Sequence, residues 1–257
     1  QQKAHERQEE LRRAYGMQRS IYDIYTRSPH FMRHPKDLVT TLLAAAKLEI
    51  FMGGSKDNAM EVLHEAARRA GGFQEVRLLT SIHQMRGDLC MSYPDAKTRI
   101  SRTEDAIKWY KTGMAEMRQL GKKEGESDQY YAFNACNCGR AIAIQVEAFE
   151  RDGTTASKIR EGLECAFESL EIIGGQDAAG QYILPTIGKL LELAKRTGMR
   201  NEITIPESVT KASVESAIVL LDSKLAEAAG NGAEECVLNE LNWKLSGLNS
   251  LLSRLAQ

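Results

Sequence analysis

Two histidines stand close in sequence to carboxylates, the arrangement that proton transfer requires. His64 has Glu61 and Glu65 on either side, and His83 is followed by Asp88. A histidine titrates near neutral pH and can act as a general acid or base when a carboxylate orients it. However, histidines at the edge of a helical core are far commoner than catalytic ones, and no serine lies in a nucleophile-elbow motif. The sequence therefore predicts that the protein is not an enzyme.

A second histidine pair, His30 and His34, has the spacing that places two imidazoles on one helix face, as in many zinc sites. Pro29 and Pro35 flank this pair and favour a loop, and no third ligand is near in the sequence. The glycine pairs of the chain match no phosphate-binding loop motif. We therefore expect neither a metal ion nor a cofactor.

The cysteines are odd in number and lie within helical patterns: Cys90, Cys136, Cys138, Cys165 and Cys236. Cys136 and Cys138 form a Cys-x-Cys motif, but side chains two residues apart on a helix point about 200° away from each other. They are therefore not expected to bind one metal ion or to pair. We expect reduced thiols in the core of a cytoplasmic protein.

The composition favours a helical protein without strong overall charge. Of 257 residues, 42% are hydrophobic and 27% are charged, with 34 Lys and Arg against 35 Asp and Glu. Five prolines and 6% aromatic residues favour helix over sheet. No apolar run approaches the length of a membrane span, so we expect no membrane partner. The net charge of −1 gives no reason to expect a nucleic-acid partner.

The first 36 residues form a locally basic segment, with eight Lys or Arg against four Asp or Glu. Such an excess is typical of a solvated helix. It also leaves open an alternative function, a helical regulatory module that binds a small ligand or nucleic acid through this helix. Because the chain begins at Gln1 without methionine or leader, we expect a domain of a larger intracellular protein.

One helix face recurs along the chain. It comprises Ala106, Ile107, Tyr110, Gly113 and Met114. Its small residues let a partner helix approach closely, and the tyrosine fills the space between them. The same spacing begins again at three positions: Ala59, Gly162 and Ala217. Each copy follows another predicted helix, so each repeat is a helical hairpin.

The periodicity predicts an all-α fold of about ten helices and no strand. The helices are expected at residues 3–28, 36–52, 57–70, 73–93, 102–121, 127–151, 155–173, 177–197, 207–229 and 233–255. The eighth is expected to be interrupted or kinked near Pro185. We expect a single domain, 1–257, with an N-terminal helix and loop (1–36), hairpin repeats (37–230) and a capping helix (231–257).

The hairpins resemble those of the tetratricopeptide-repeat (TPR) family. The face that starts at Ala106 is similar to the second helix of the family's repeat. Leu184, Ile187, Gly188 and Leu191 match the pattern of the repeat's first helix. The resemblance implies antiparallel hairpins stacked as an α-solenoid. The copies are 47, 56 and 55 residues apart, longer than the family's repeat of about 34 residues. The alternatives are another α-solenoid or a closed bundle such as the nine-helix 14-3-3 architecture.

In a TPR-like solenoid the first helices line a concave groove. The resemblance places six side chains there: Gln84, Asp88, Asn137, Arg140, Lys189 and Glu192. The aromatic-rich segment around Phe133 adds Tyr130 and Asn134 as partner-binding residues, because aromatic rings supply anchor area and amides pair with peptide backbone. Only Asn137 matches the carboxylate clamp of some TPR domains, so we expect no chaperone-tail binding. The mixed charge favours an amphipathic helix or an extended peptide.

The final predicted helix carries Trp243 and has apolar residues on more than one face. Such a helix either caps the last repeat or pairs with another surface, such as a second copy of the chain. Together these features predict a non-enzymatic scaffold or sensor domain that binds a protein or peptide partner.

Overall fold

A computed structural model describes residues 9–10, 12–14, 16–17, 20, 23–24, 27, 35–51, 55–72, 75–93, 95–124, 129–149, 155–173, 177–199 and 202–256. Within these ranges the chain is predominantly helical and contains no strand, which confirms the predicted all-α class. The helices are α2 (Pro35–Phe51), α3 (Lys56–Gly72), α4 (Val76–Met91), α5 (Ala96–Ser101), α6 (Thr103–Glu124), α7 (Gln129–Ala148), α8 (Thr155–Ile173), α9 (Asp177–Arg196), α10 (Lys211–Gly230) and α11 (Glu235–Leu255).

Two predictions fall largely outside this description. Of the basic helix predicted at 3–28, only scattered residues between 9 and 27 are described, and these are helical. His30 and His34 lie outside the described residues. Within the described ranges, no helix combines the length and the apolar character needed to cross a membrane.

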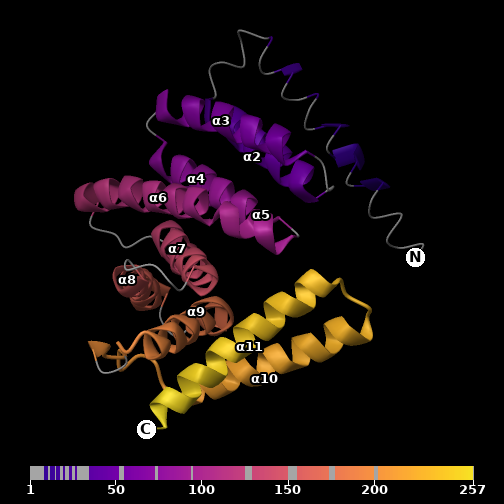
Figure 1. The fold of residues 1–257 in the computed structure, drawn as a ribbon. Coiled ribbons are helices and arrows are strands. Elements are labelled where there is room, and N and C mark those ends of the chain that lie inside the picture. Colours follow the sequence, from indigo (N-terminus) through magenta and orange to yellow (C-terminus); the bar gives the residue numbers. More distant parts are fainter. Residues whose placement is uncertain are drawn as a thin grey trace.

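Three helical hairpins follow one another along the molecule (Figure 1). α2 packs on α3, α4 on α6, and α7 on α8. Each second helix also packs on the first helix of the next hairpin, as α6 does on α7. The first helices in turn contact one another, α2 with α4, α4 with α7 and α7 with α9. We call these four helices the first row.

Small residues let the helices of each hairpin approach closely. A Cβ atom on Gly87 of α4 would lie 2.5 Å from Cζ of Tyr110, a fully buried side chain of α6. A Cβ atom on Gly139 of α7 would lie 2.9 Å from the carbonyl oxygen of Gly162 on α8. Both distances are too short for a real Cβ, so the recurring face seen in the sequence is the face that packs the hairpins.

The short helix α5 lies between the helices predicted at 73–93 and 102–121, where the sequence predicted no helix. Asp95 caps this helix, since its Oδ1 accepts a 2.8 Å hydrogen bond from the backbone N–H of Thr98. Aspartate is a common N-cap, because its side chain accepts a hydrogen bond from a backbone N–H of the first turn that has no partner within the helix. A helix of six residues is too short for periodicity to reveal.

α9 departs from the predicted hairpin pattern. We expected its partner to be α10, which carries the copy at Ala217, but α9 packs most extensively on α11. A Cβ atom on Gly188 would lie 2.5 Å from the carbonyl carbon of Gly247, and one on Gly247 would overlap the carbonyl oxygen of Pro185. α9 also continues through Pro185, so of the interruption or kink expected there the interruption is absent.

The α9–α11 pair is parallel, whereas a hairpin is antiparallel. Near the start of α9, the ring of Tyr182 lies 4.7 Å from Nζ of Lys244. Further along α9, Glu192 accepts a 3.3 Å hydrogen bond from Ser250. Residue numbers rise together along both helices, so α11 runs in the same direction as α9.

The segment between α9 and α10 is held in place by its own contacts. Met199 and Val209 are buried in the core, and Glu202 forms an ion pair with Arg160 of α8. Gly198, at φ 79°, provides the left-handed turn that ends α9. This segment separates α10 from α9, and α10 then packs mainly on α11.

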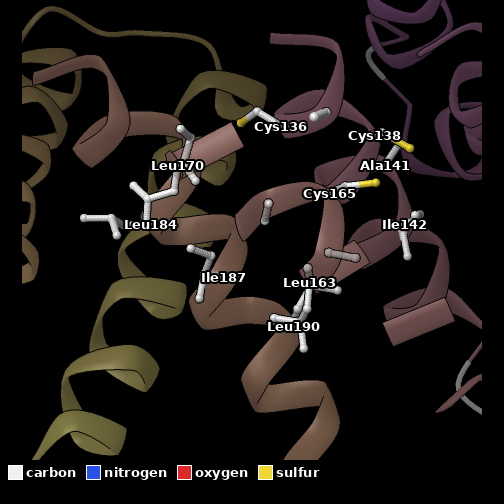
Figure 2. Close-up of a cluster of buried hydrophobic side chains, with 14 of the residues drawn as sticks. Cys136, Cys138, Ala141, Ile142, Leu163, Cys165, Leu170, Leu184, Ile187 and Leu190 are labelled. Carbon is white, nitrogen blue, oxygen red and sulfur yellow. The ribbon is translucent and has the colours of Figure 1, made fainter. Parts of the chain in front are cut away.

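The core consists of two clusters of buried side chains. The smaller one joins α2, α3 and α4, and the larger one extends from Cys90 in α4 to Leu251 in α11. Figure 2 shows the middle of the larger cluster, where Ile142, Leu163 and Leu190 come from α7, α8 and α9. Full burial of such a side chain contributes about 1.5–3 kcal/mol. α7 is therefore fixed on several sides, and only one stripe of it reaches solvent.

Candidate partner-binding face

The centre of the predicted binding region is the carboxyl group of Asp88 on α4. Its Oδ1 accepts hydrogen bonds from the Tyr110 hydroxyl at 2.7 Å and from Nδ2 of Asn137 at 3.1 Å. Gln84, one turn earlier on α4, donates a further bond. Three of the predicted site residues, from α4 and α7, are thus brought together around one carboxylate.

The Asp88 residue is exposed at the surface, but neighbouring side chains enclose its carboxyl group. This partial loss of water raises the pKa of Asp88, although the hydrogen bond from Tyr110 and the charges of Arg140 and Lys47 pull the pKa down. Lys47 belongs to α2, so the electrostatic environment of Asp88 extends across three first-row helices.

A chain of charges continues from α7 onto α11. Nη2 of Arg140 donates a 2.6 Å hydrogen bond to Glu240, and Nζ of Lys244 lies 3.4 Å from the same carboxyl group. Burial lowers the pKa of Lys244, and its ammonium group lies over the ring of Tyr182. We call the whole set the α4–α7–α11 polar face: Gln84, Asp88, Asn137, Arg140, Glu240 and Lys244.

Exposed aromatic rings flank the polar face. Tyr130 and Phe133 are each 40% exposed and precede Asn137 on the same stripe of α7, while Tyr182 is 51% exposed. Large rings at partly exposed positions are common anchors of protein–protein contacts. The structure thus places Tyr130 at the edge of the polar face, and it adds Phe133 and Tyr182 to the residues predicted from sequence.

Asn134 does not reach this surface. It is fully buried, and its Nδ2 donates a 2.8 Å hydrogen bond to the carbonyl oxygen of Tyr130. A Cβ atom on Gly113 of α6 would lie 2.8 Å from the Asn134 side-chain oxygen, so the amide occupies the space that the glycine leaves. The geometry makes Asn134 a packing residue between α6 and α7 instead of a partner contact.

Lys189 and Glu192 do not line an open groove, because α11 lies over them. Lys189 is only 6% exposed, and its Nζ lies 3.5 Å from Glu147 and 3.3 Å from Glu192. Burial opposes ionisation of Glu192, but the charge of Lys189 and the other nearby donors lower its pKa overall. Trp243 of α11 donates a 3.1 Å hydrogen bond to Glu147. The C-terminal part of the first row is therefore covered by the chain itself.

The two histidines first considered for proton transfer lie on a different side from Asp88. The ring of His83 stacks on Trp109 at 5.6 Å, and His64 meets the same indole edge-on at 6.1 Å. Burial, together with the nearby charge of Arg86, lowers the pKa of His83 to about 4. His83 is thus neutral near pH 7, and neither ring has a hydrogen-bonded carboxylate as its orienting partner in the geometry described. Nothing in this cluster assembles a general acid–base pair.

A cavity of about 170 Å³ lies near the C-terminal ends of α9 and α11. It is lined by Leu191, Glu192, Ala194, Lys195, Ser250, Ser253 and Arg254. Because the negative ends of two helix dipoles point toward this region, its basic side chains complement the helices themselves. Among the described residues, no group of three or more His, Cys, Asp or Glu is placed to hold a metal ion.

No protein-family model matches the chain. No curated protein matches its sequence either. The resemblance to the TPR family consequently stays a prediction based on the residues and packing described above.

Proposed function

We propose that the chain is a protein-interaction domain that binds a partner helix or extended peptide on the α4–α7–α11 polar face. The proposal keeps the predicted role of a scaffold or sensor within an intracellular protein, with a TPR-like arrangement of hairpins. It restricts binding to α2, α4 and α7 and to the edge of α11 that adjoins them, since α11 covers Lys189 and Glu192 of α9.

The observation that carries the proposal is a solvent-reachable polar network flanked by exposed aromatic rings. Asn137 and Arg140 are partly exposed, and the Asp88 residue beside them is exposed and accepts a hydrogen bond from Asn137. Phe133 and Tyr182 offer apolar area beside it. Ordered polar groups next to aromatic anchors are the usual composition of a peptide-binding surface.

α11 shows how a helix can bind to this row. Its Glu240 pairs with Arg140 of α7, and one turn later its Trp243 donates to Glu147 of the same helix. A carboxylate and an aromatic ring three residues apart thus fit two exposed groups of α7. We expect a partner helix that lies on α4 and α2 to carry a carboxylate and an aromatic ring at the same spacing. It should also present a hydrogen-bond donor to Asp88.

The test begins with selection of binding peptides from a random library on the folded full chain. The affinity of one selected peptide is then measured for the wild type, Asn137→Ala and Phe133→Ala. Glu164→Ala, an exposed carboxylate on α8, serves as a control because it lies outside the face. Loss of affinity in the first two variants alone supports the proposal. Equal affinity in all forms, or dependence on the basic N-terminal segment with steep salt sensitivity, would refute it.

A further inference from the structure

Cys138 and Cys165 form a thiol pair across the interface of α7 and α8. Cys138 is fully buried and Cys165 is 7% exposed. Figure 2 shows their two sulfur atoms near each other at one end of the cluster. The two thiols lie close enough together for each to shift the pKa of the other. The Cys-x-Cys motif in the sequence is a different pair, because Figure 2 shows Cys136 apart from these two sulfurs and the positive charges that influence it are those of Arg140 and Lys244.

The backbone geometry around the pair suits a covalent bond. α7 and α8 come closest at Gly139 and Gly162, where a Cβ atom would lie 2.9 Å from a carbonyl oxygen. Gly139 is adjacent to Cys138, and Gly162 lies one turn before Cys165. A disulfide needs two Cα atoms roughly 4.4–6.8 Å apart, a separation that helices reach only at such close crossings.

The environment distinguishes the two sulfurs. The neighbouring Cys138 thiol lowers the pKa of Cys165, although burial and the charges of Glu161 and Glu168 oppose this effect. Contact with Cys165 and burial raise the pKa of Cys138. The positive charge of Lys111 lowers both pKa values, and its partner Glu161 raises them. Cys165 is therefore the sulfur that ionises and attacks, and Cys138 is the neighbour that can resolve the product.

The other buried cysteines lack these features. Burial raises the pKa of Cys90 to about 11 and that of Cys136 to about 12. Thiols buried in apolar surroundings stay protonated and react slowly. Cys236 is partly exposed on α11 but has no thiol beside it among the described residues.

We propose that Cys138 and Cys165 are a redox couple that a hydroperoxide oxidises reversibly to a disulfide between α7 and α8. In the first step the Cys165 thiolate attacks a peroxide oxygen, so that an S–O bond forms and the O–O bond breaks. The departing hydroxide takes a proton and leaves as water, and Cys165 becomes a sulfenic acid.

In the second step the sulfur of Cys138 attacks that of Cys165. The S–S bond forms, the S–O bond breaks, and the hydroxide leaves with the proton of Cys138 as a second water. Two thiols have then lost two electrons, and hydrogen peroxide has been reduced to two waters. A dithiol reductant reverses the reaction by thiol–disulfide exchange. The disulfide would tie α8 to the helix that carries Asn137 and Arg140, and its formation does not depend on the proposed partner.

The experiment treats the folded full chain with stoichiometric hydrogen peroxide, blocks remaining thiols, digests with trypsin and identifies linked peptides without reduction. The expected product joins the peptide that ends at Arg140 to the peptide of residues 161–189. Cys136→Ala is the matched control, because Cys136 lies in the first peptide and its removal should leave the link intact. Cys138→Ala should abolish the link and leave Cys165 as a sulfenic acid that dimedone traps.

A second readout does not depend on any variant. In the untreated folded chain, Cys165 should be alkylated at neutral pH at least about tenfold faster than Cys90 or Cys136, in line with its larger thiolate fraction. A link between Cys136 and Cys165, oxidation confined to Cys236, or equal alkylation of all buried thiols would overturn the proposal.

Discussion

The buried hydroxyl of Tyr110 donates a 2.7 Å hydrogen bond to the carboxylate of Asp88. The ring of the same tyrosine fills the space left by Gly87, where α4 and α6 cross. One side chain therefore belongs both to the hairpin packing and to the polar face. Packing of the core therefore fixes the position of the Asp88 carboxylate, and its hydrogen bonds are already formed without a partner.

Replacement of Tyr110 by phenylalanine would remove the hydroxyl and leave the ring in place. A hydrogen bond to a charged group contributes about 1.5–3 kcal/mol, so the free energy of unfolding should fall by about 2 kcal/mol. The pKa of Asp88 should rise further, because this bond lowers it. Urea denaturation and NMR titration of the variant measure the two effects. Unchanged stability would show that the bond makes no net contribution.

Gly188→Ala tests whether α11 is the partner of α9. The new Cβ atom would meet the backbone of Gly247, which cannot move without separating the two helices. We expect a loss of about 3 kcal/mol, the upper end for overpacking, together with a change in Trp243 fluorescence. Gly230→Ala is the control, since nothing lies within 4 Å of that position. Equal stability of the two variants would contradict the α9–α11 contact.

Asp88 should make the protein less stable as pH rises. Burial raises its folded pKa above the 3.8 of an ordinary aspartate, so the folded state binds this proton more tightly than the unfolded state does. Stability is therefore lost between pH 3.8 and the raised folded value, and is constant above it. Asp88→Asn keeps an acceptor for Tyr110 but cannot titrate. The free energy of unfolding of the wild type minus that of the variant should decline as pH rises from 3.8 to the raised folded pKa. A constant difference would contradict the raised pKa of Asp88.

His83 should have the opposite effect. Its folded pKa of about 4 lies below the 6.5 of an ordinary histidine, so its contribution is complete above pH 6.5 and disappears as pH falls to 4. The shift corresponds to about 3 kcal/mol. His83→Phe should keep the contact with Trp109 and lose this acid sensitivity. Urea denaturation at about pH 7.5 and about pH 4.5 makes the comparison. Equal losses of unfolding free energy in the wild type and in His83→Phe would refute the lowered pKa of His83.

Local pattern was sufficient to predict most of the helices and the way each hairpin packs. The spacing of Ala106, Tyr110 and Gly113 predicted a tightly packed face, and the structure buries all three residues. Local pattern could not identify partners that are distant in sequence. The copy at Ala217 resembles the others, but Gly247 of α11 provides the close backbone contact for α9.

The same limit explains the differences at the candidate site. Asn134 is as polar as Asn137 and lies one turn away, yet only the structure places it opposite Gly113 and away from solvent. Lys189 and Glu192 lie on α9, a first-row helix, but no sequence signal showed that α11 would cover them. Cys138 and Cys165 are too far apart in sequence for any spacing rule to pair them.

The affinity of a selected peptide for Phe133→Ala and Asn137→Ala tests the central claim most directly, measured beside Glu164→Ala by calorimetry on proteins of equal helicity. Truncation of an aromatic anchor typically costs about 2 kcal/mol or more, so each face variant should bind at least about tenfold more weakly, while the control binds as the wild type does. Unchanged affinity in both face variants would show that partners bind elsewhere and that the α4–α7–α11 polar face serves only the fold.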